Sequence, residues 1–123
     1  MTDPNFIILY VEDAATSAAF YSDLLGKAPI ESSPAFAMFV LANGLKLGVW
    51  SRHTVEPIAT ATGGGCELLF TLDTESAVDT LHADWLRRGL KIAQAPIRME
   101  FGYTFVALDP DGHRLRVYAP AAA

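Results

Sequence analysis

The side chains best suited to chemistry in this sequence alternate with aliphatic ones along short segments. Near the end of the chain, for example, Arg116 and Tyr118 alternate with Leu115 and Val117. Because successive side chains of a β-strand point to opposite faces, this pattern predicts one aliphatic face and one face of aromatic, charged and small residues. The residues expected on the second face are Tyr10, Lys46, Gly48, Trp50, Glu67, Thr71, Arg116 and Tyr118. A face rich in tryptophan, tyrosine and arginine is typical of a ligand site or a protein interface.

The histidines and the cysteine give little support for metal or nucleophilic chemistry. His82 and His113 are not spaced as metal ligands, and the sequence places no Ser/His/Asp arrangement in space. His53 follows Trp50 in a loop, where we weigh a surface position above a place at the rim of a site. Cys66 is the single cysteine, so it forms no internal disulfide. It follows three glycines and starts a strand, and we expect it to be a small buried residue.

Two copies of one unit are expected to position these residues. In the first copy, the apolar run at residues 6–11 predicts a buried strand. Asp13 predicts the N-cap of a helix over residues 14–25, and Gly26 predicts its end. Three short strands are expected next, at about residues 28–32, 36–42 and 45–51.

The second copy repeats this order after a glycine-rich linker. Residues 66–72 predict a strand, and Asp73 or Thr74 predicts the N-cap of a helix from Glu75 to about Arg88. Three strands follow, near residues 90–94, 102–108 and 113–118. The sequence therefore predicts an α+β fold with two tandem β-α-β-β-β modules in one domain. The expected bounds are about residues 5–59 and 66–120 for the modules and 60–65 for the linker, within a domain of residues 1–123.

Composition narrows the function classes. A chain of 123 residues with 51% hydrophobic and 19% charged residues can build one core and is not disordered. The apolar surplus favours a subunit interface or an apolar pocket. The formal net charge of −5 argues against a nucleic-acid partner. The first residues carry no basic segment, and the run at 6–11 is too short for a signal peptide or a membrane span. We expect a soluble, cytoplasmic protein without a membrane partner.

Two segments resemble a known superfamily: the helix Phe20–Lys27 and the turn Asp109–His113. They are similar to the glyoxalase / bleomycin-resistance / extradiol-dioxygenase superfamily, also called vicinal oxygen chelate, over about residues 5–120. The resemblance implies that the two modules form a curved mixed sheet shaped as a cup. The superfamily contains both metal enzymes and metal-free drug-binding proteins, so function has to be argued from the site.

The resemblance also implies four inward-facing metal positions, one on the first and last strand of each module. In this sequence they are Phe6, Gly48, Glu67 and Arg116. Phenylalanine and glycine offer no ligand atom, arginine is a permanent cation, and one carboxylate cannot hold a divalent ion alone. We therefore expect no metal and no other cofactor. Glu67 and Arg116 either form an ion pair where the metal would be or are separately solvated.

A closer resemblance is to the phenazine-antibiotic resistance proteins of this superfamily. It rests on Tyr10-Val11, on Trp50-Ser51 followed by Glu56-Pro57, and on Asp109–His113 continuing to Arg116-Val117. It implies a metal-free homodimer that holds a flat aromatic antibiotic between aromatic side chains, with Trp50 as the stacking surface. Arg116, Arg114 or Lys46 would meet a carboxylate on the ligand. The implied ligand-binding residues are Phe6, Tyr10, Gly48, Trp50, Glu67, Phe101, Tyr103, Arg116 and Tyr118.

Three functions stay open on the sequence. The first is sequestration of a planar aromatic antibiotic such as a phenazine, which needs affinity and no catalytic residue. The second is a lyase, isomerase or dioxygenase with an atypical site and Glu67 as general base. The third is a small partner or sensor domain whose cup binds no ligand.

Overall fold

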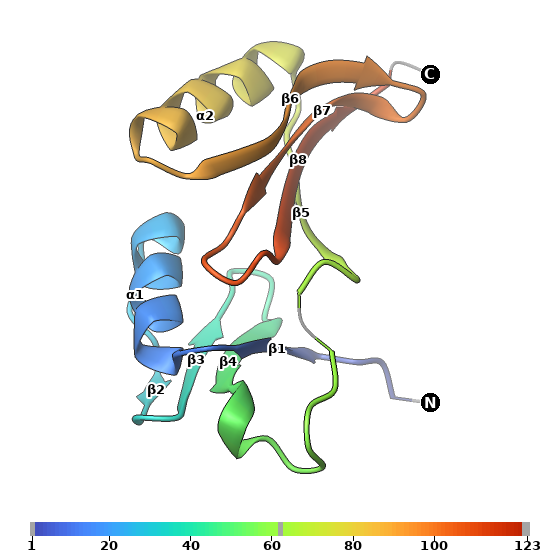
Figure 1. Ribbon diagram of the computed structural model, residues 1–123. Helices are drawn as coiled ribbons and strands as arrows, with labels where there is room; N and C mark the ends of the chain where they lie inside the picture. The colour runs from blue at the N-terminus through green and yellow to red at the C-terminus, as the bar shows by residue number, and fades with distance from the viewer. Residues whose placement is uncertain (1, 62, 122–123) are drawn as a thin grey trace. The chain divides into compact units, whose positions relative to one another are not determined.

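A computed structural model describes residues 2–61 and 63–121. The chain divides into two compact units, residues 1–63 and 64–123, and this boundary lies within the expected linker. Each unit contains one α-helix and one four-stranded sheet (Figure 1). The expectation of an α+β fold with two tandem β-α-β-β-β modules is confirmed.

The first unit places its helix after its first strand. Its sheet has the order β1-β4-β3-β2, with β1 parallel to β4 and the other neighbours antiparallel. A short 3₁₀ turn over Arg52–Thr54 follows the last strand. The elements are β1 (Phe6–Val11), α1 (Ala14–Leu25), β2 (Glu31–Ser32), β3 (Phe36–Val40) and β4 (Lys46–Ser51).

Helix α1 begins and ends where its caps predict. The Asp13 carboxylate accepts a hydrogen bond from the Ala15 amide, and Gly26 adopts the left-handed conformation with φ of 67°. The buried side of α1 includes Tyr21, which is fully enclosed. On the sheet, the buried side chains come from alternate positions, and they are Leu9, Val11, Ala37, Phe39, Leu47 and Val49.

The second unit repeats the topology of the first. Its sheet has the order β5-β8-β7-β6, with β5 parallel to β8. The elements are β5 (Glu67–Thr71), α2 (Glu75–Arg87), β6 (Lys91–Met99), β7 (Gly102–Leu108) and β8 (Arg114–Pro120). Strand β6 extends beyond the expected 90–94. The prediction stopped short because two register shifts between Ile92 and Ile97 interrupt the alternation of side chains on which sequence patterns depend.

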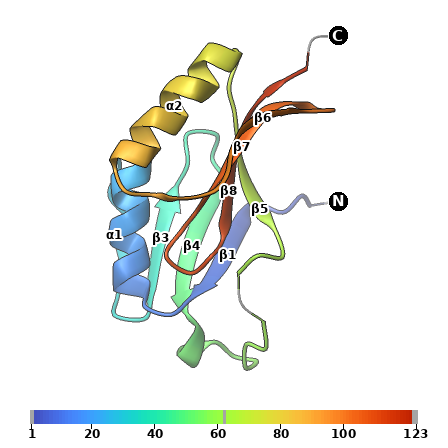
Figure 2. The same cartoon turned by 45° about the horizontal axis from the view of Figure 1, so that its top comes forward.

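Helix α2 lies along one face of its sheet (Figure 2), and a core centred on Trp85 packs between them. Trp85 is 3% exposed and makes edge contacts with Phe70 and Phe105, each with ring centroids 5.5 Å apart. Leu115 and Val117 of β8 are buried on the same face. The opposite face of the sheet, which α2 does not cover, carries Arg114, Arg116 and Tyr118.

Two further points concern residues outside the cores. Cys66 is exposed in the bend before β5, so the expectation that it is buried is wrong. Cys66 lies in a bend one residue before β5, so the alternation of buried and exposed positions along the strand does not apply to it. Across the described residues, no helix is both long and apolar enough to span a bilayer.

Candidate functional site

Trp50 lies near the end of β4, on the face of the first sheet that α1 does not cover, called here the uncovered face. The strand register places Tyr10 of β1 on one side of it and Phe36 of β3 on the other. The ring centroids of Tyr10 and Phe36 lie 6.3 Å and 6.4 Å from that of Trp50, at interplanar angles of 81° and 88°. Both contacts are edge-type, so neither neighbour lies parallel on the half-buried indole. A flat molecule stacking on Trp50 would adopt that parallel arrangement.

Gly48 makes room for two more rings on this face. A Cβ atom at position 48 would lie 3.0 Å from Cε1 of Phe6 and 3.1 Å from Cε1 of Phe36. The two rings therefore pack directly over the glycine backbone. Lys46 places Nζ 5.8 Å from the centroid of the Phe6 ring, within the range of a cation–π contact. The uncovered face of the first sheet is consequently aromatic, with one cation at its border.

The uncovered face of the second sheet is built around an ion pair. Arg116 Nε and Nη2 donate to Oε1 and Oε2 of Glu67 at 2.8 Å and 3.0 Å, and Nη1 donates to Thr104 Oγ1 at 3.2 Å. The side chains of Arg116 and Glu67 are 15% and 27% exposed. Of the two alternatives left open by the sequence, the ion pair is confirmed. The hydrogen bonds from Arg116 lower the pKa of the Glu67 carboxyl below its ordinary value, although burial acts in the opposite direction.

Phe101 and Tyr118 lie next to this ion pair. The Phe101 ring makes an edge contact with Tyr118 at a centroid distance of 5.8 Å. Arg116 Cζ lies 5.5 Å from the centroid of Phe101. Glu67, Phe101, Arg116 and Tyr118 are thus brought together on one face of the second sheet.

Tyr103 lies on the other face of that sheet. It shares its side of β7 with the core residue Phe105, and its hydroxyl donates to Asp79 Oδ1 on α2 at 2.6 Å. This hydrogen bond raises the pKa of Tyr103 above its ordinary value. Strand alternation could have predicted this position, because Tyr103 is two residues from the core residue Phe105 and so points to the same face of β7. Tyr103 therefore does not line the same surface as Arg116.

The residues at the four implied metal positions do not fit a divalent ion. Both carboxylate oxygens of Glu67 are engaged by Arg116, and the rings around Gly48 fill the space a ligand side chain would need. Within residues 2–61 and 63–121, no three His, Cys, Asp or Glu side chains are grouped as a metal site would require. The donor set on these strands suits packing and charge pairing.

Two residues missed by the sequence reasoning contribute to these faces. Phe36 shares its side of β3 with Met38 and contacts Trp50, a position that the alternation with Ala37 and Phe39 could have revealed. Gln94 of β6 lies opposite Val106 on the face of the ion pair. The register shifts in β6 hide it from any sequence pattern.

His53 takes a surface contact at the end of the first sheet. Its Nε2 lies 2.8 Å from Glu12 Oε1, and Arg52 Nε lies 3.2 Å from Glu12 Oε2. The hydrogen bond with His53 lowers the pKa of Glu12. All three side chains are well exposed, so this cluster contributes little stability.

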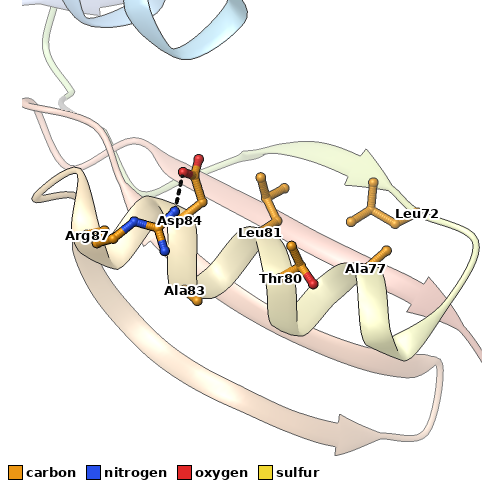
Figure 3. A pocket seen from close by; sticks show the side chains of 7 residues that line it. All are labelled: Leu72, Ala77, Thr80, Leu81, Ala83, Asp84 and Arg87. Atoms are coloured by element: carbon orange, nitrogen blue, oxygen red, sulfur yellow. Dashed lines mark hydrogen bonds and ion pairs between the residues drawn. The ribbon is translucent and has the colours of Figure 1, made fainter.

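A cavity lies along helix α2. It measures about 690 Å³, and its lining side chains project from α2, apart from Leu72 in the segment between β5 and α2 (Figure 3). The lining residues are Leu72, Ala77, Thr80, Leu81, Ala83, Asp84 and Arg87. Asp84 is paired with Arg87 and Arg88 at 3.0 Å and 3.2 Å. The lining is mostly aliphatic, and its charged groups already satisfy one another.

Comparison with known proteins assigns the family. Residues 4–117 match the model of the Glyoxalase/Bleomycin resistance protein/Dioxygenase superfamily. The phenazine antibiotic resistance protein EhpR of Enterobacter agglomerans is 30% identical over 117 residues, 93% of this chain and 89% of that protein.

Solved structures agree with this assignment. A protein of Agrobacterium tumefaciens with a known solution structure is 58% identical, covers 99% of this chain and 100% of its own, and has a TM-score of 0.91. A glyoxalase/bleomycin resistance protein/dioxygenase family enzyme of Burkholderia phytofirmans shares the fold at 24% identity, with a TM-score of 0.81 over 98% and 100% of the two chains. The tandem units, the family match over residues 4–117 and the 30% identical relative agree: the chain belongs to the glyoxalase / bleomycin resistance protein / dioxygenase superfamily.

Proposed function

We propose that this protein binds a planar aromatic small molecule, without a metal, by stacking it on Trp50. The observation that carries the proposal is the position of the indole, half-buried between Tyr10 and Phe36 with edge contacts to both. The two flanking rings would border a flat ligand while Trp50 supports its face. The similarity to a phenazine antibiotic resistance protein suggests a phenazine as the ligand and sequestration of an antibiotic as the role.

Stacking on an indole adds about 0.5–1.5 kcal/mol to the free energy of binding, beyond the burial of apolar surface. The remainder would come from removing the ligand and the exposed ring of Tyr10 from water; Tyr10 is 40% exposed. Such a site needs no catalytic group. Its selectivity would come from the flatness and width of the ligand.

Two observations support a role without metal or general-base chemistry. Phe6 and Gly48 provide no metal ligand, and Arg116 occupies the carboxylate of Glu67. A carboxylate whose pKa is lowered by an arginine is also a weaker proton acceptor. This disfavours the alternative of a lyase, isomerase or dioxygenase that uses Glu67 as its base.

Tryptophan emission tests the proposal, because the two tryptophans differ in exposure. Trp85 is 3% exposed within its core, so contact quenching by a ligand that stacks on the surface acts on Trp50. Titration with phenazine-1-carboxylate is expected to give saturable, partial quenching at micromolar concentrations. By calorimetry, Trp50→Ala should bind at least tenfold more weakly, about 1.4 kcal/mol. Tyr103→Phe is the matched control, since this ring lies on the helix-covered face of the second sheet, and it should bind as the wild type does.

Two results would contradict the proposal. One is an unchanged affinity in Trp50→Ala, which would remove the indole from the site. The other is stoichiometric zinc, nickel, manganese or iron in the purified protein, which would overturn the metal-free part. Homodimer formation and a cytoplasmic location complete the proposed picture. A solution mass equal to the monomer's 13.3 kDa would exclude the homodimer.

A further inference from the structure

A cavity in the first unit lies beside the 3₁₀ turn that follows β4. The turn and the segment after it, up to residue 61, supply the whole lining. The cavity measures about 450 Å³, within the range of about 300–1,000 Å³ that is usual for small-molecule sites. Trp50 is not part of the lining. The lining residues are Arg52, His53, Val55, Ile58, Ala59, Thr60 and Ala61.

Arg52 brings a positive charge to the wall of this cavity. Its Nε atom lies 3.2 Å from Glu12 Oε2, and its side chain is 43% exposed. Within the described residues, no acceptor forms a hydrogen bond with either of its two Nη groups. Two such groups side by side match the two oxygens of a carboxylate, so the guanidinium can still take an anionic partner.

Glu12 does not cancel this charge inside the cavity. Its side chain is outside the lining and is 64% exposed, so water and salt screen its carboxylate. Its contacts with Arg52 Nε and His53 Nε2, the latter at 2.8 Å, hold both side chains at the end of the first sheet. The Nη end of the guanidinium is thereby left to the cavity.

The remainder of the lining is largely aliphatic. Val55 is buried, and Ile58 is 83% exposed on the loop that follows it. Ala59 and Ala61 add two short apolar side chains. A ligand that covers Ile58 would remove apolar surface from water, which favours binding. This part of the cavity suits a hydrocarbon group and offers no second cation.

We propose that this cavity binds a small aliphatic monocarboxylate, with the carboxylate on the Nη groups of Arg52 and the hydrocarbon part against Val55 and Ile58. A dianion such as phosphate would bring two charges to a wall with one arginine. An alcohol of the same shape would contact the aliphatic side chains and leave the guanidinium to water. A short acid such as acetate would do the reverse. Only the combination of one negative charge and a hydrocarbon group matches both parts of the lining.

This site goes beyond the proposed stacking on Trp50 and does not depend on it. The cations that the resemblance implied for a stacked ligand are Lys46, Arg114 and Arg116, and the lining of this cavity includes none of them. The Trp50→Ala variant should therefore keep its affinity for aliphatic carboxylates. The two proposals can fail separately.

The experiment follows backbone amide shifts of the full-length ¹⁵N-labelled chain at constant ionic strength and about pH 8, where an ordinary imidazole is neutral and Arg52 is the cation under test. The probes are isovalerate, acetate, isoamyl alcohol and inorganic phosphate. Isovalerate is expected to give saturable shifts centred on Arg52, Ile58 and Ala59, and to bind several-fold more tightly than acetate. The alcohol and phosphate are expected to give no saturable shift at these residues.

Two variants separate the contributions of the charge and of the aliphatic wall. Arg52→Gln should weaken the binding of both isovalerate and acetate at least tenfold, because it removes the charge. Ile58→Ser removes the exposed apolar side chain, so acetate should bind unchanged and the preference for isovalerate should shrink. Arg87→Gln removes an exposed arginine charge on α2 and serves as the matched control, with wild-type binding expected.

Specific outcomes overturn the proposal. It fails if the isovalerate shifts do not saturate, or if Arg52→Gln responds as the wild type does. It also fails if isovalerate and acetate bind equally in the wild type, since the hydrocarbon part would then have no partner. Saturable binding of phosphate at the same residues would replace it with a general anion site. Because the two acids are compared within Ile58→Ser, that variant decides the role of the aliphatic wall even if Arg52→Gln does not fold.

Discussion

The uncovered faces of the two sheets make a contact between the same strand positions with different side chains. In the first sheet, Phe6 pairs with Lys46 in the parallel register and packs over Gly48, two residues further along β4. In the second, Glu67 pairs with Arg114 and reaches Arg116, also two residues further along β8. The same diagonal contact between parallel strands is made by a ring over a glycine in one unit and by an ion pair in the other.

The comparison teaches how this scaffold can fill the same pair of strand positions with two different kinds of contact. An aromatic ring needs space, and the loss of the side chain at Gly48 supplies it. A carboxylate with little access to water needs a counter-charge, and Arg116 supplies it with two hydrogen bonds. Each solution is complete within its own unit, so each can be tested by itself.

Removing the charge of Glu67 should give the largest effect. In Glu67→Gln the Arg116 guanidinium, 15% exposed, loses its counter-charge, and we expect the free energy of unfolding to fall by about 2 kcal/mol. Urea unfolding measures it. Glu75→Gln is the matched control, because its partner Arg98 is 74% exposed. That change should cost less than about 1 kcal/mol.

The double variant Glu67→Gln/Arg116→Gln sharpens this result. If the two side chains act as a pair, the double variant should lose less stability than the sum of the single ones, with a coupling of about 1–2 kcal/mol. Additivity of the three values would mean that the ion pair contributes nothing beyond two separate side chains. The contrast between the two faces would then be one of composition alone.

The packing over Gly48 should give a smaller effect. A Cβ at this position would push on Phe6 and Phe36, so Gly48→Ala is expected to lower the free energy of unfolding by about 1 kcal/mol. Gly65→Ala is the control, because among the described residues no atom beyond its chain neighbours lies within 4 Å of a Cβ there. It should be neutral or slightly stabilising. If Gly48→Ala behaves like Gly65→Ala, the rings are not packed on the glycine as the structure has them.

The smallest effect is confined to acid pH and concerns the second face only. Arg116 lowers the pKa of Glu67 in the folded protein, so its stabilisation is complete above the ordinary value of 4.5 and is lost as the pH falls through the folded pKa. The stability difference between wild type and Glu67→Gln should therefore shrink as the pH drops below about 4.5. Urea unfolding over this pH range measures the difference. A difference that is constant with pH would contradict the cause assigned to the lowered pKa.

Much of the fold could be predicted because its signals are local. Asp13 and Gly26 bound α1 through interactions within a few residues, and Trp85 is in the core as its helical spacing requires. The uncovered faces follow from strand alternation, which also places Tyr10 and Trp50 together. Such patterns depend only on the period of a helix or a strand.

The parts that could not be predicted depend on contacts distant in sequence or on irregular strands. The sequence left two states open for Glu67 and Arg116, because their contact spans 49 positions along the chain. Gln94 is hidden by the register shifts of β6, and Cys66 by a bend. Tyr103 was expected beside the ligand, although its parity with Phe105 pointed to the helix-covered face.

The backbone at the end of β4, beside Trp50, is held by hydrogen bonds, and this bears on how a ligand would bind there. Ser51, the next residue, donates its amide to the Ala35 carbonyl, while its hydroxyl accepts from the Ala14 amide at the start of α1. The backbone beside the indole is thus held from two sides before any ligand arrives. Preorganisation of this kind spares a complex the entropic cost of ordering its contact surface. The affinity of the face would then reflect the fit of the ligand more than any rearrangement of the protein.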